Sequence, residues 1–317
     1  MTPHSPSARV CAGVVTFNPD IGRLSENLTS ISSQVDRVIL VDNASTNWEA
    51  IDTLLRSFPS VHAIRNSENR GIAAALNQVG RQAISEKYEY ALMLDQDSVT
   101  APQMTQVLLN HVGPEIGIVS PQIVDRNRFP DRPPASALDH QTYDVKQAAR
   151  KGIITSGALT SLRAFDDIGG FDESFFIDYV DYDYNKRLLG RGYTLRRTGD
   201  TFLFHECGEL SPTLLWTPRR GQDSGWTFER FYSFGHSPTR CYYKARNRIL
   251  YSKKHGFWDS TKHFEGYAQI LPQVVLTLLF EQDRMAKLRA FSKGVVDGLR
   301  TRVSEGPDRP SSAEVVQ

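Results

Sequence analysis

The stretch RVCAGVVTF at residues 9–17 is a nearly continuous apolar run, and it predicts a buried β-strand. After it, Ile21, Leu24, Leu28 and Ile31 recur at the spacing of one helix face. The same alternation predicts further strands at 35–42, 61–65, 90–94 and 116–120, and helices at 48–58, 71–85 and 102–112. Apolar strands that alternate with helices predict an α/β domain with a parallel sheet covered on both faces.

Polar residues follow four of these strands directly. They form the segments 16–19 (TFNP), 42–45 (DNAS), 66–71 (NSENRG) and 95–98 (DQDS). Ligands bind at the carboxyl ends of parallel strands, where these segments would gather. Any one of them is an ordinary turn, because Asn, Asp, Ser and Gly are common turn residues. Four in series favour a binding site.

Two carboxylates, Asp95 and Asp97, stand where an apolar strand ends. Such groups are hard oxygen ligands, suited to Mg²⁺ or Mn²⁺. A metal there would offset the charge of a departing diphosphate. Alone the pair is a weak signal, since Asp residues also cap helices and form turns.

A second acidic cluster follows the segment GGFDE at 169–173. It holds Asp178, Asp181 and Asp183, interleaved with aromatic residues, and a helix is expected from about Tyr179 to Gly190. Acidic residues are favourable at a helix N-terminus in any case. A carboxylate among aromatic side chains also tends to have a raised pKa, which suits a general base.

These motifs together resemble glycosyltransferase family 2, over about residues 9–250. The form DQDS at 95–98 and the segment FIDYVD at 176–181 are most similar to bacterial rhamnosyltransferases of O-antigen and cell-wall polysaccharide assembly. One departure is Asp183-Tyr184, where such enzymes often have Glu-Trp.

The resemblance implies a GT-A (nucleotide-diphospho-sugar transferase) fold, with a Rossmann-like, mostly parallel sheet and a mainly helical C-terminal extension. It implies an inverting transfer, with Mg²⁺ or Mn²⁺, from dTDP-rhamnose to a saccharide or lipid-linked saccharide. Asp181 matches the catalytic base, and Asp97 and His205 match metal ligands, although a lone His is as often structural. Matched to the donor pocket are Thr16, Phe17, Asn18, Asp42, Asn69, Gly71, Asn77, Asp95, Gln96 and Arg246. Arg246 has an alternative interpretation, as part of a solvated helix face.

The charge of the chain is unevenly distributed. The total is +1, but residues 219–302 carry 16 Lys and Arg against 7 Asp and Glu, and the remainder is acidic. The balance argues against a nucleic-acid binder. The basic region fits either a packed helical subdomain or a surface that meets an anionic membrane, and its apolar run at 274–280 is too short to span one.

Four segments are expected from the pattern: a flexible N-terminus at 1–8, the catalytic domain at 9–215, a basic helical region at 216–303 and a disordered tail at 304–317. Three scattered cysteines and a polar N-terminus without a signal-peptide layout indicate a cytoplasmic protein, for which attachment to the inner face of the membrane stays an open alternative.

Three alternatives remain open at the sequence level. A transferase of the same family could use a UDP-sugar. A haloacid-dehalogenase-type phosphatase also uses Asp-x-Asp with Mg²⁺, but usually has Thr where this chain has Val99. A non-catalytic sugar-nucleotide-binding protein is the third.

Overall fold

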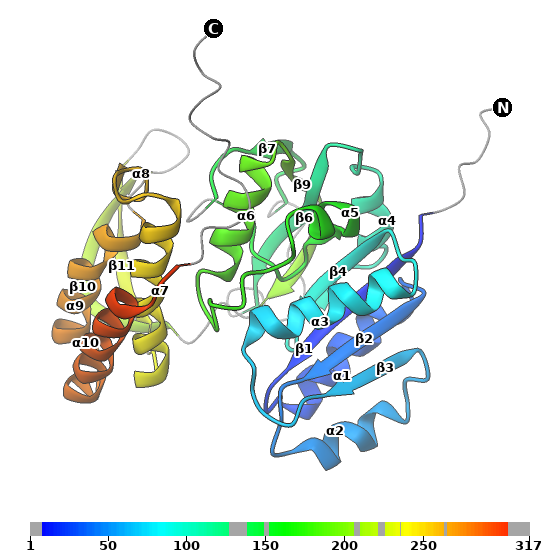
Figure 1. Cartoon of the computed structure of the whole chain (residues 1–317), viewed down its shortest axis with the longest axis horizontal. Coiled ribbons are helices and arrows are strands. Elements are labelled where there is room, and N and C mark those ends of the chain that lie inside the picture. Colours follow the sequence, from blue (N-terminus) through cyan, green and yellow to red (C-terminus); the bar gives the residue numbers. More distant parts are fainter. Residues whose placement is uncertain are drawn as a thin grey trace, which may run out of the picture. The chain divides into compact units, whose positions relative to one another are not determined.

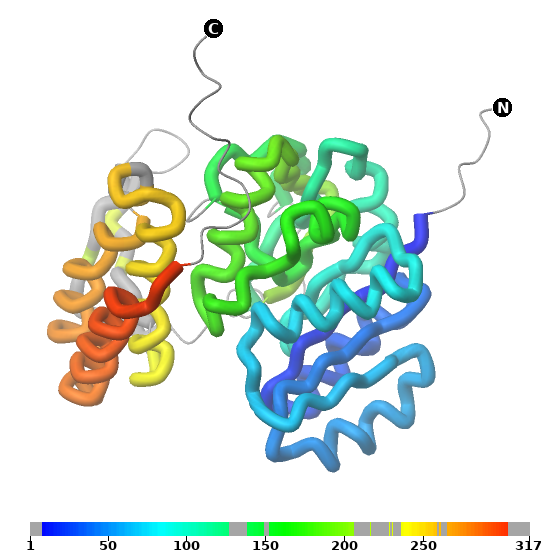
Figure 2. Tube along the Cα trace, viewed as in Figure 1, coloured from blue at the N-terminus to red at the C-terminus, as the bar shows by residue number. Residues whose placement is uncertain are grey.

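The computed structural model describes residues 8–126, 138–148, 152–205, 210–220, 226–234, 236–262 and 265–303. The chain divides into two compact units, which we call unit 1 (residues 1–207) and unit 2 (residues 208–317). The sequence pattern placed this division after residue 215. Figure 2 traces unit 1 from blue to green and unit 2 from yellow-green to red. The tail expected at 304–317 and all but the last residue of the N-terminus expected at 1–8 lie outside the described residues.

Unit 1 is built on one mixed, mostly parallel sheet (Figure 1). Its strands, over the described residues, follow the order β3-β2-β1-β4-β8-β6-β9-β5, and β7 pairs with β9. They are β1 (Val10–Thr16), β2 (Arg37–Asp42), β3 (Val61–Arg65), β4 (Tyr90–Asp95), β5 (Val99–Thr100), β6 (Ile116–Asp125), β7 (Thr142–Val145), β8 (Leu159–Ser161) and β9 (Thr194–His205). The helices are α1 (Ile21–Ile31), α2 (Trp48–Leu55), α3 (Ile72–Ser85), α4 (Met104–Leu109), α5 (Leu162–Asp167) and α6 (Val180–Gly190).

The strands expected from the first 120 residues are all present, and they pair in parallel where they adjoin. β1 is parallel to β2 and β4, and β2 is parallel to β3. The sequence pattern did not predict β8, which lies between β4 and β6 and is antiparallel to both. With only three residues, β8 is too short to show a periodic pattern.

Helices cover both faces of the sheet, as predicted. On one face, the buried side chains of α1, α2 and α4 join those of β1, β2 and β4 in one apolar cluster, among them Leu28, Ile51 and Leu108. On the other face lies α3, which crosses β1 and β4 in Figure 1. Gly13 of β1 permits this close packing, because a Cβ there would overlap the side chain of Val79 on α3.

Unit 2 consists of a β-hairpin followed by helices. Strands β10 (Leu210–Arg220) and β11 (Trp226–Phe234) pair antiparallel, whereas the sequence pattern predicted mainly helix from residue 216. The helical part is α7 (Pro238–His255), α8 (Phe257–Lys262), the 3₁₀ turn η2 (Gly266–Gln269), α9 (Ile270–Phe280) and α10 (Arg284–Arg300). Gly294 and Gly298 bring α10 close to α7, and a Cβ on Gly298 would lie 2.9 Å from the Arg246 carbonyl oxygen. Among the described residues, no helix is both long and apolar enough to cross a membrane.

Candidate active site

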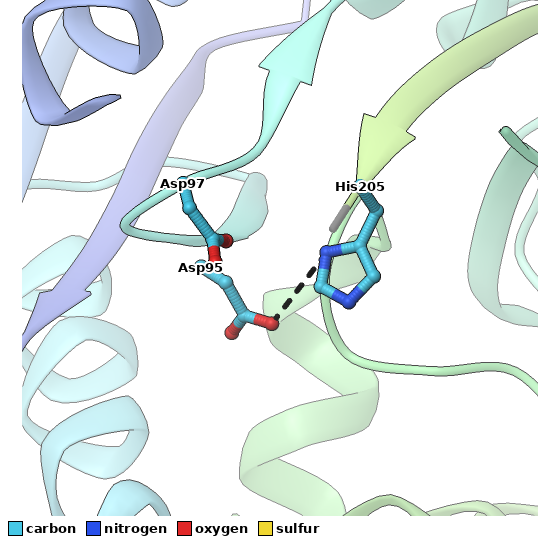
Figure 3. Close-up of side chains that lie close together, drawn as sticks. All are labelled: Asp95, Asp97 and His205. Carbon is cyan, nitrogen blue, oxygen red and sulfur yellow. Dashed lines mark ion pairs between the residues drawn. The ribbon is translucent and has the colours of Figure 1, made fainter. Parts of the chain in front are cut away.

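Asp95, Asp97 and His205 come together at the end of the sheet (Figure 3). Asp95 is the last residue of β4 and His205 is the last of β9. The short strand β5 explains the meeting, because Val99 pairs with Phe204 and so carries the Asp95–Asp97 turn to His205. One candidate ligand atom from each of the three side chains lies within 4.8 Å of the others. The Asp95 Oδ2 and His205 Nδ1 atoms are 3.9 Å apart.

Buried polar side chains hold this turn in place. Asn27 on α1 donates from Nδ2 to the carbonyl oxygens of Asp95, at 2.9 Å, and Ser98, at 2.7 Å. Ser156 accepts from the Asp95 N–H at 3.0 Å, and its Oγ lies 2.8 Å from that of Ser98. Ser98 Oγ is 3.1 Å from His205 Nδ1. No local pattern singled out Asn27 or Ser156, because each meets the site only through the fold.

The three side chains suit a divalent cation. Asp97 Oδ1 is buried and has no hydrogen-bond partner within the described structure. A buried carboxylate oxygen without a donor is unfavourable unless a cation or a solvent molecule satisfies it. Two carboxylates and one imidazole are a donor set that Mg²⁺ or Mn²⁺ accepts. The grouping of Asp95, Asp97 and His205 is thus a candidate metal site.

Asp181 stands in the first turn of α6, where the charge of Asp95 acts on it. It accepts a hydrogen bond from the Thr155 hydroxyl. Burial raises the pKa of Asp181 to about 6, and the negative charges of Asp95 and Asp178 act in the same direction, whereas the Thr155 hydrogen bonds lower it. A carboxyl group with such a pKa is largely ionised at neutral pH and yet basic enough to take a proton.

The backbone entering α6 is unusual. Asp178 and Tyr179 have φ angles of +61° and +68°, in the left-handed region that non-glycine residues rarely adopt. The Tyr179 ring meets that of Tyr182 edge to face at 5.0 Å between centroids. Two consecutive left-handed residues cost free energy, and such conformations cluster at functional sites.

Asp183, two residues after Asp181, lies in a different environment. It is fully buried and its Oδ2 accepts from Arg187 Nε at 2.7 Å, one helical turn later. The next residue, Tyr184, stacks on Phe171 with ring centroids 4.0 Å apart. Asp183 is therefore a partner of Arg187 in the packing of α6.

The loops after β1 and β2 are joined by hydrogen bonds around Asp42. Asp42 is fully buried and accepts from the Thr16 hydroxyl at 2.9 Å and from the Ser45 N–H at 2.9 Å. Asn18, at φ +47°, accepts through Oδ1 from the N–H and the hydroxyl of Thr46. Thr16, Asn18 and Asp42 thus shape these loops, and their contact with a nucleoside remains a prediction.

Phe17 and Gln96 connect the ends of β1 and β4. The Phe17 N–H donates to Gln96 Oε1 at 2.8 Å, while the Phe17 ring is 47% exposed. The two polar strand ends therefore meet at one edge of the sheet, as the sequence predicted, and they present an aromatic ring to solvent there.

The loop before α3 contacts the segment that leads to the acidic helix. Asn69 accepts through Oδ1 from the Gly71 N–H at 2.9 Å. Gly71 has a φ of +82°, and a Cβ there would lie 2.6 Å from the Phe176 carbonyl oxygen, which accepts from the Ile72 N–H at 2.8 Å. Only glycine fits this position. The hydrogen bond between Ile72 and Phe176 then holds the loop against the segment that precedes Asp178.

Asn77 fixes the GGFDE segment onto α3. It is buried, donates from Nδ2 to the Phe171 carbonyl oxygen at 2.8 Å and to Glu173 Oε1 at 2.9 Å, and accepts from the Phe171 N–H at 2.8 Å. The structure thus gives Asn77 an anchoring role, and its place in a donor pocket stays a prediction.

Arg246 lies on α7 of unit 2, with Nη1 3.0 Å from Asn247 Oδ1. Its contact with a diphosphate also stays a prediction.

Comparisons with known proteins agree with these features. Residues 11–167 match the family model described as glycosyl transferase family 2. The dTDP-rhamnosyl transferase RfbF of Shigella flexneri is 28% identical over 256 residues, covering 78% of this chain and 81% of that protein.

Several solved structures share the fold. S. aureus TarS 1-349 in complex with UDP-GlcNAc has a TM-score of 0.54 and 15% identity, covering 90% of this chain and 81% of that one. The mannosyltransferase PcManGT from Pyrobaculum calidifontis, in complex with GDP-Man and Mn²⁺, has a TM-score of 0.52 and 17% identity, covering 93% and 76%. The predicted GT-A fold is thereby confirmed, and the match to the glycosyl transferase family model argues against the phosphatase alternative. The chain is a glycosyltransferase with a family 2 domain, and its sequence is rhamnosyltransferase-like.

Proposed function

We propose that this enzyme transfers L-rhamnose from dTDP-rhamnose to a hydroxyl group of a saccharide or lipid-linked saccharide, with inversion at the anomeric carbon. The observation that carries the proposal is the position of Asp181. Its pKa is raised to about 6, in part by the charge of Asp95, and this supports a proposed base that lies near the candidate metal group. The similarity to a dTDP-rhamnosyl transferase supports the donor.

Asp181 acts in this proposal as the general base. Its carboxylate takes the proton of the acceptor hydroxyl while the oxygen attacks the anomeric carbon. The bond from that carbon to the donor diphosphate breaks on the opposite face, and the nucleoside diphosphate leaves with the electron pair. A single displacement needs one base and no covalent sugar–enzyme intermediate. The Thr155 hydroxyl orients Asp181 for this step.

Asp95, Asp97 and His205 would hold Mg²⁺ or Mn²⁺. When bound, the ion supplies positive charge that offsets the charge on the diphosphate. The buried, unpartnered Asp97 Oδ1 supports this assignment, as does the Mn²⁺ in the structure of the mannosyltransferase relative. The exposed Phe17 ring and the loops around Asp42 and Gly71 would receive the nucleoside.

The donor is tested by thermal stability, because a ligand that binds only the native state stabilises it by mass action. We expect dTDP-rhamnose with Mg²⁺ to raise the melting temperature more than UDP- or GDP-sugars. The reaction itself would then be followed by the transfer of radiolabelled rhamnose from dTDP-rhamnose to an acceptor saccharide. Stabilisation by UDP-sugars alone would overturn the rhamnose assignment and favour a UDP-sugar transferase of the same family.

A lipid-linked acceptor would bring the enzyme to the cytoplasmic face of the membrane. The basic residues of unit 2, which include Arg284, Arg289 and Lys293, would then meet anionic head groups.

A further inference from the structure

Helix α9 (Ile270–Phe280) of unit 2 has its polar residues on the protein side and its apolar residues outside. Residues 266–280 contain no charged side chain. The polar residues Gln269, Gln273 and Thr277 recur at every fourth position, and Glu281 continues the series. Residues four apart share one helix face. Thr277 and Glu281 are buried, so this face points into unit 2.

The polar face is fixed by a buried network. Gln273 Nε2 lies 3.4 Å from Glu281 Oε1, which also accepts from the Thr277 hydroxyl at 3.4 Å. Glu281 Oε2 pairs with Lys287 Nζ at 2.9 Å, and both side chains are more than nine-tenths buried. Turning the apolar side of α9 inward would leave this charge pair without its amide and hydroxyl neighbours, which is costly for buried charges. The orientation of α9 is therefore determined by its contacts.

The outer face of α9 is apolar and open. Leu271 is 71% exposed and Leu279 58%, and Val275 and Leu278 lie between them on the same side. On α8, Trp258 is 81% exposed. A surface helix of a water-soluble protein has the opposite arrangement, and a contiguous exposed apolar face marks an interaction surface.

The chemistry around this face favours a lipid surface. An indole is amphipathic and is enriched where hydrocarbon meets head groups. Helix α10 packs beside α9 (Figure 1) and exposes Arg284, Arg289 and Lys293. These cations attract anionic head groups, whereas a symmetric contact between two copies of the face would bring like charges together.

We propose that α9 inserts its apolar face into the head-group region of an anionic bilayer, and that the exposed Trp258 of α8, a helix that like α9 contacts the η2 turn, enters it too. With eleven residues, α9 is too short to cross the hydrocarbon layer, so it lies parallel to the surface. The polar stripe then faces the protein and the apolar stripe faces the acyl chains. This inference concerns unit 2 alone and does not depend on the transfer reaction.

Vesicle flotation of the full chain tests the proposal. The probes are phosphatidylcholine vesicles and vesicles with about one third phosphatidylglycerol. We expect the wild type to float with the anionic vesicles, and the triple variant L271Q/V275Q/L278Q to bind at least about tenfold more weakly. The matched control V296Q/L299Q changes two exposed apolar residues on α10 and should bind within about twofold of the wild type.

Three further measurements separate insertion from other causes. Trp258 emission should shift to the blue and be quenched by brominated lipid, and W258F should lose that signal while floating. Urea unfolding of the triple variant should match that of the wild type, which excludes misfolding as the cause. Equal flotation of the triple variant and the wild type would overturn the proposal. So would a wild-type dimer, measured by light scattering, that the triple variant converts to a monomer.

Discussion

The two acidic regions of unit 1 contain the same side chain in different environments. In the turn after β4, Asp97 has a buried oxygen without a donor and lies beside Asp95 and His205. At the start of α6, Asp181 is held by the Thr155 hydroxyl, and Asp183 is paired with Arg187. A carboxylate without cationic partners is available for a metal or a proton, whereas a paired one stabilises the fold. The role of each Asp thus follows from what it contacts.

The largest expected effect is on catalysis. Asp181→Asn removes the proposed base without changing the size of the side chain, so we expect kcat to fall by about 10²- to 10⁴-fold. Donor affinity, measured by calorimetry with Mg²⁺, should change little. Near-normal turnover would contradict the role of Asp181 as base.

Asp183→Asn should affect stability instead. Removing one partner of a buried pair leaves the Arg187 charge uncompensated, which costs about 3–5 kcal/mol. Urea unfolding measures this loss. The double variant D183N/R187M should recover part of it, because no unpaired charge remains. If Asp183→Asn unfolded like the wild type, Asp183 would not have the structural role that its contacts indicate.

Asp97→Ala tests the other acidic region. We expect the affinity for the nucleoside diphosphate to fall by about 10- to 100-fold when Mg²⁺ or Mn²⁺ is present. In EDTA the variant and the wild type should bind equally weakly. An equal loss with and without metal would argue that Asp97 contacts the nucleotide directly.

The smallest expected effect is a gain in stability for Asp181→Asn in metal-free buffer. The pKa of Asp181 is raised from 3.8 to about 6 by burial, so the folded state disfavours its charge. Below about pH 3 the carboxyl is protonated in both states, and between about pH 3 and 6 it ionises first in the unfolded chain. The wild type therefore loses stability as pH rises through this window.

At about pH 7.5 the Asn variant should be more stable than the wild type by about 1–3 kcal/mol, and at about pH 4 the difference should fall below about 1 kcal/mol. Urea unfolding at both pH values provides the comparison. A destabilised variant at about pH 7.5 would show that ionised Asp181 stabilises the fold. Asp181 would then have a structural role, like Asp183.

The local pattern of the sequence predicted much of the fold and part of the site. The alternation of residues 9–120 predicted the strands and helices in order, because a strand or helix face repeats within a few residues. The strand ends predicted that Asp95, Asp97 and the loop at Phe17 would share one edge. The first helical turn of α6 likewise follows from the acidic residues around Asp181.

Contacts between residues distant in sequence were decided only by the tertiary structure. The pairing of β5 with β9 brings His205 to Asp95, and the fold turns Asn77 toward Phe171. The orientation of α9 was also decided by tertiary contacts. Its sequence is mostly apolar, and the buried pair of Glu281 and Lys287 determines which side of the helix faces outward. The periodicity of a segment indicates its secondary structure and which residues share a face. What each face contacts is determined by the packing of the rest of the chain.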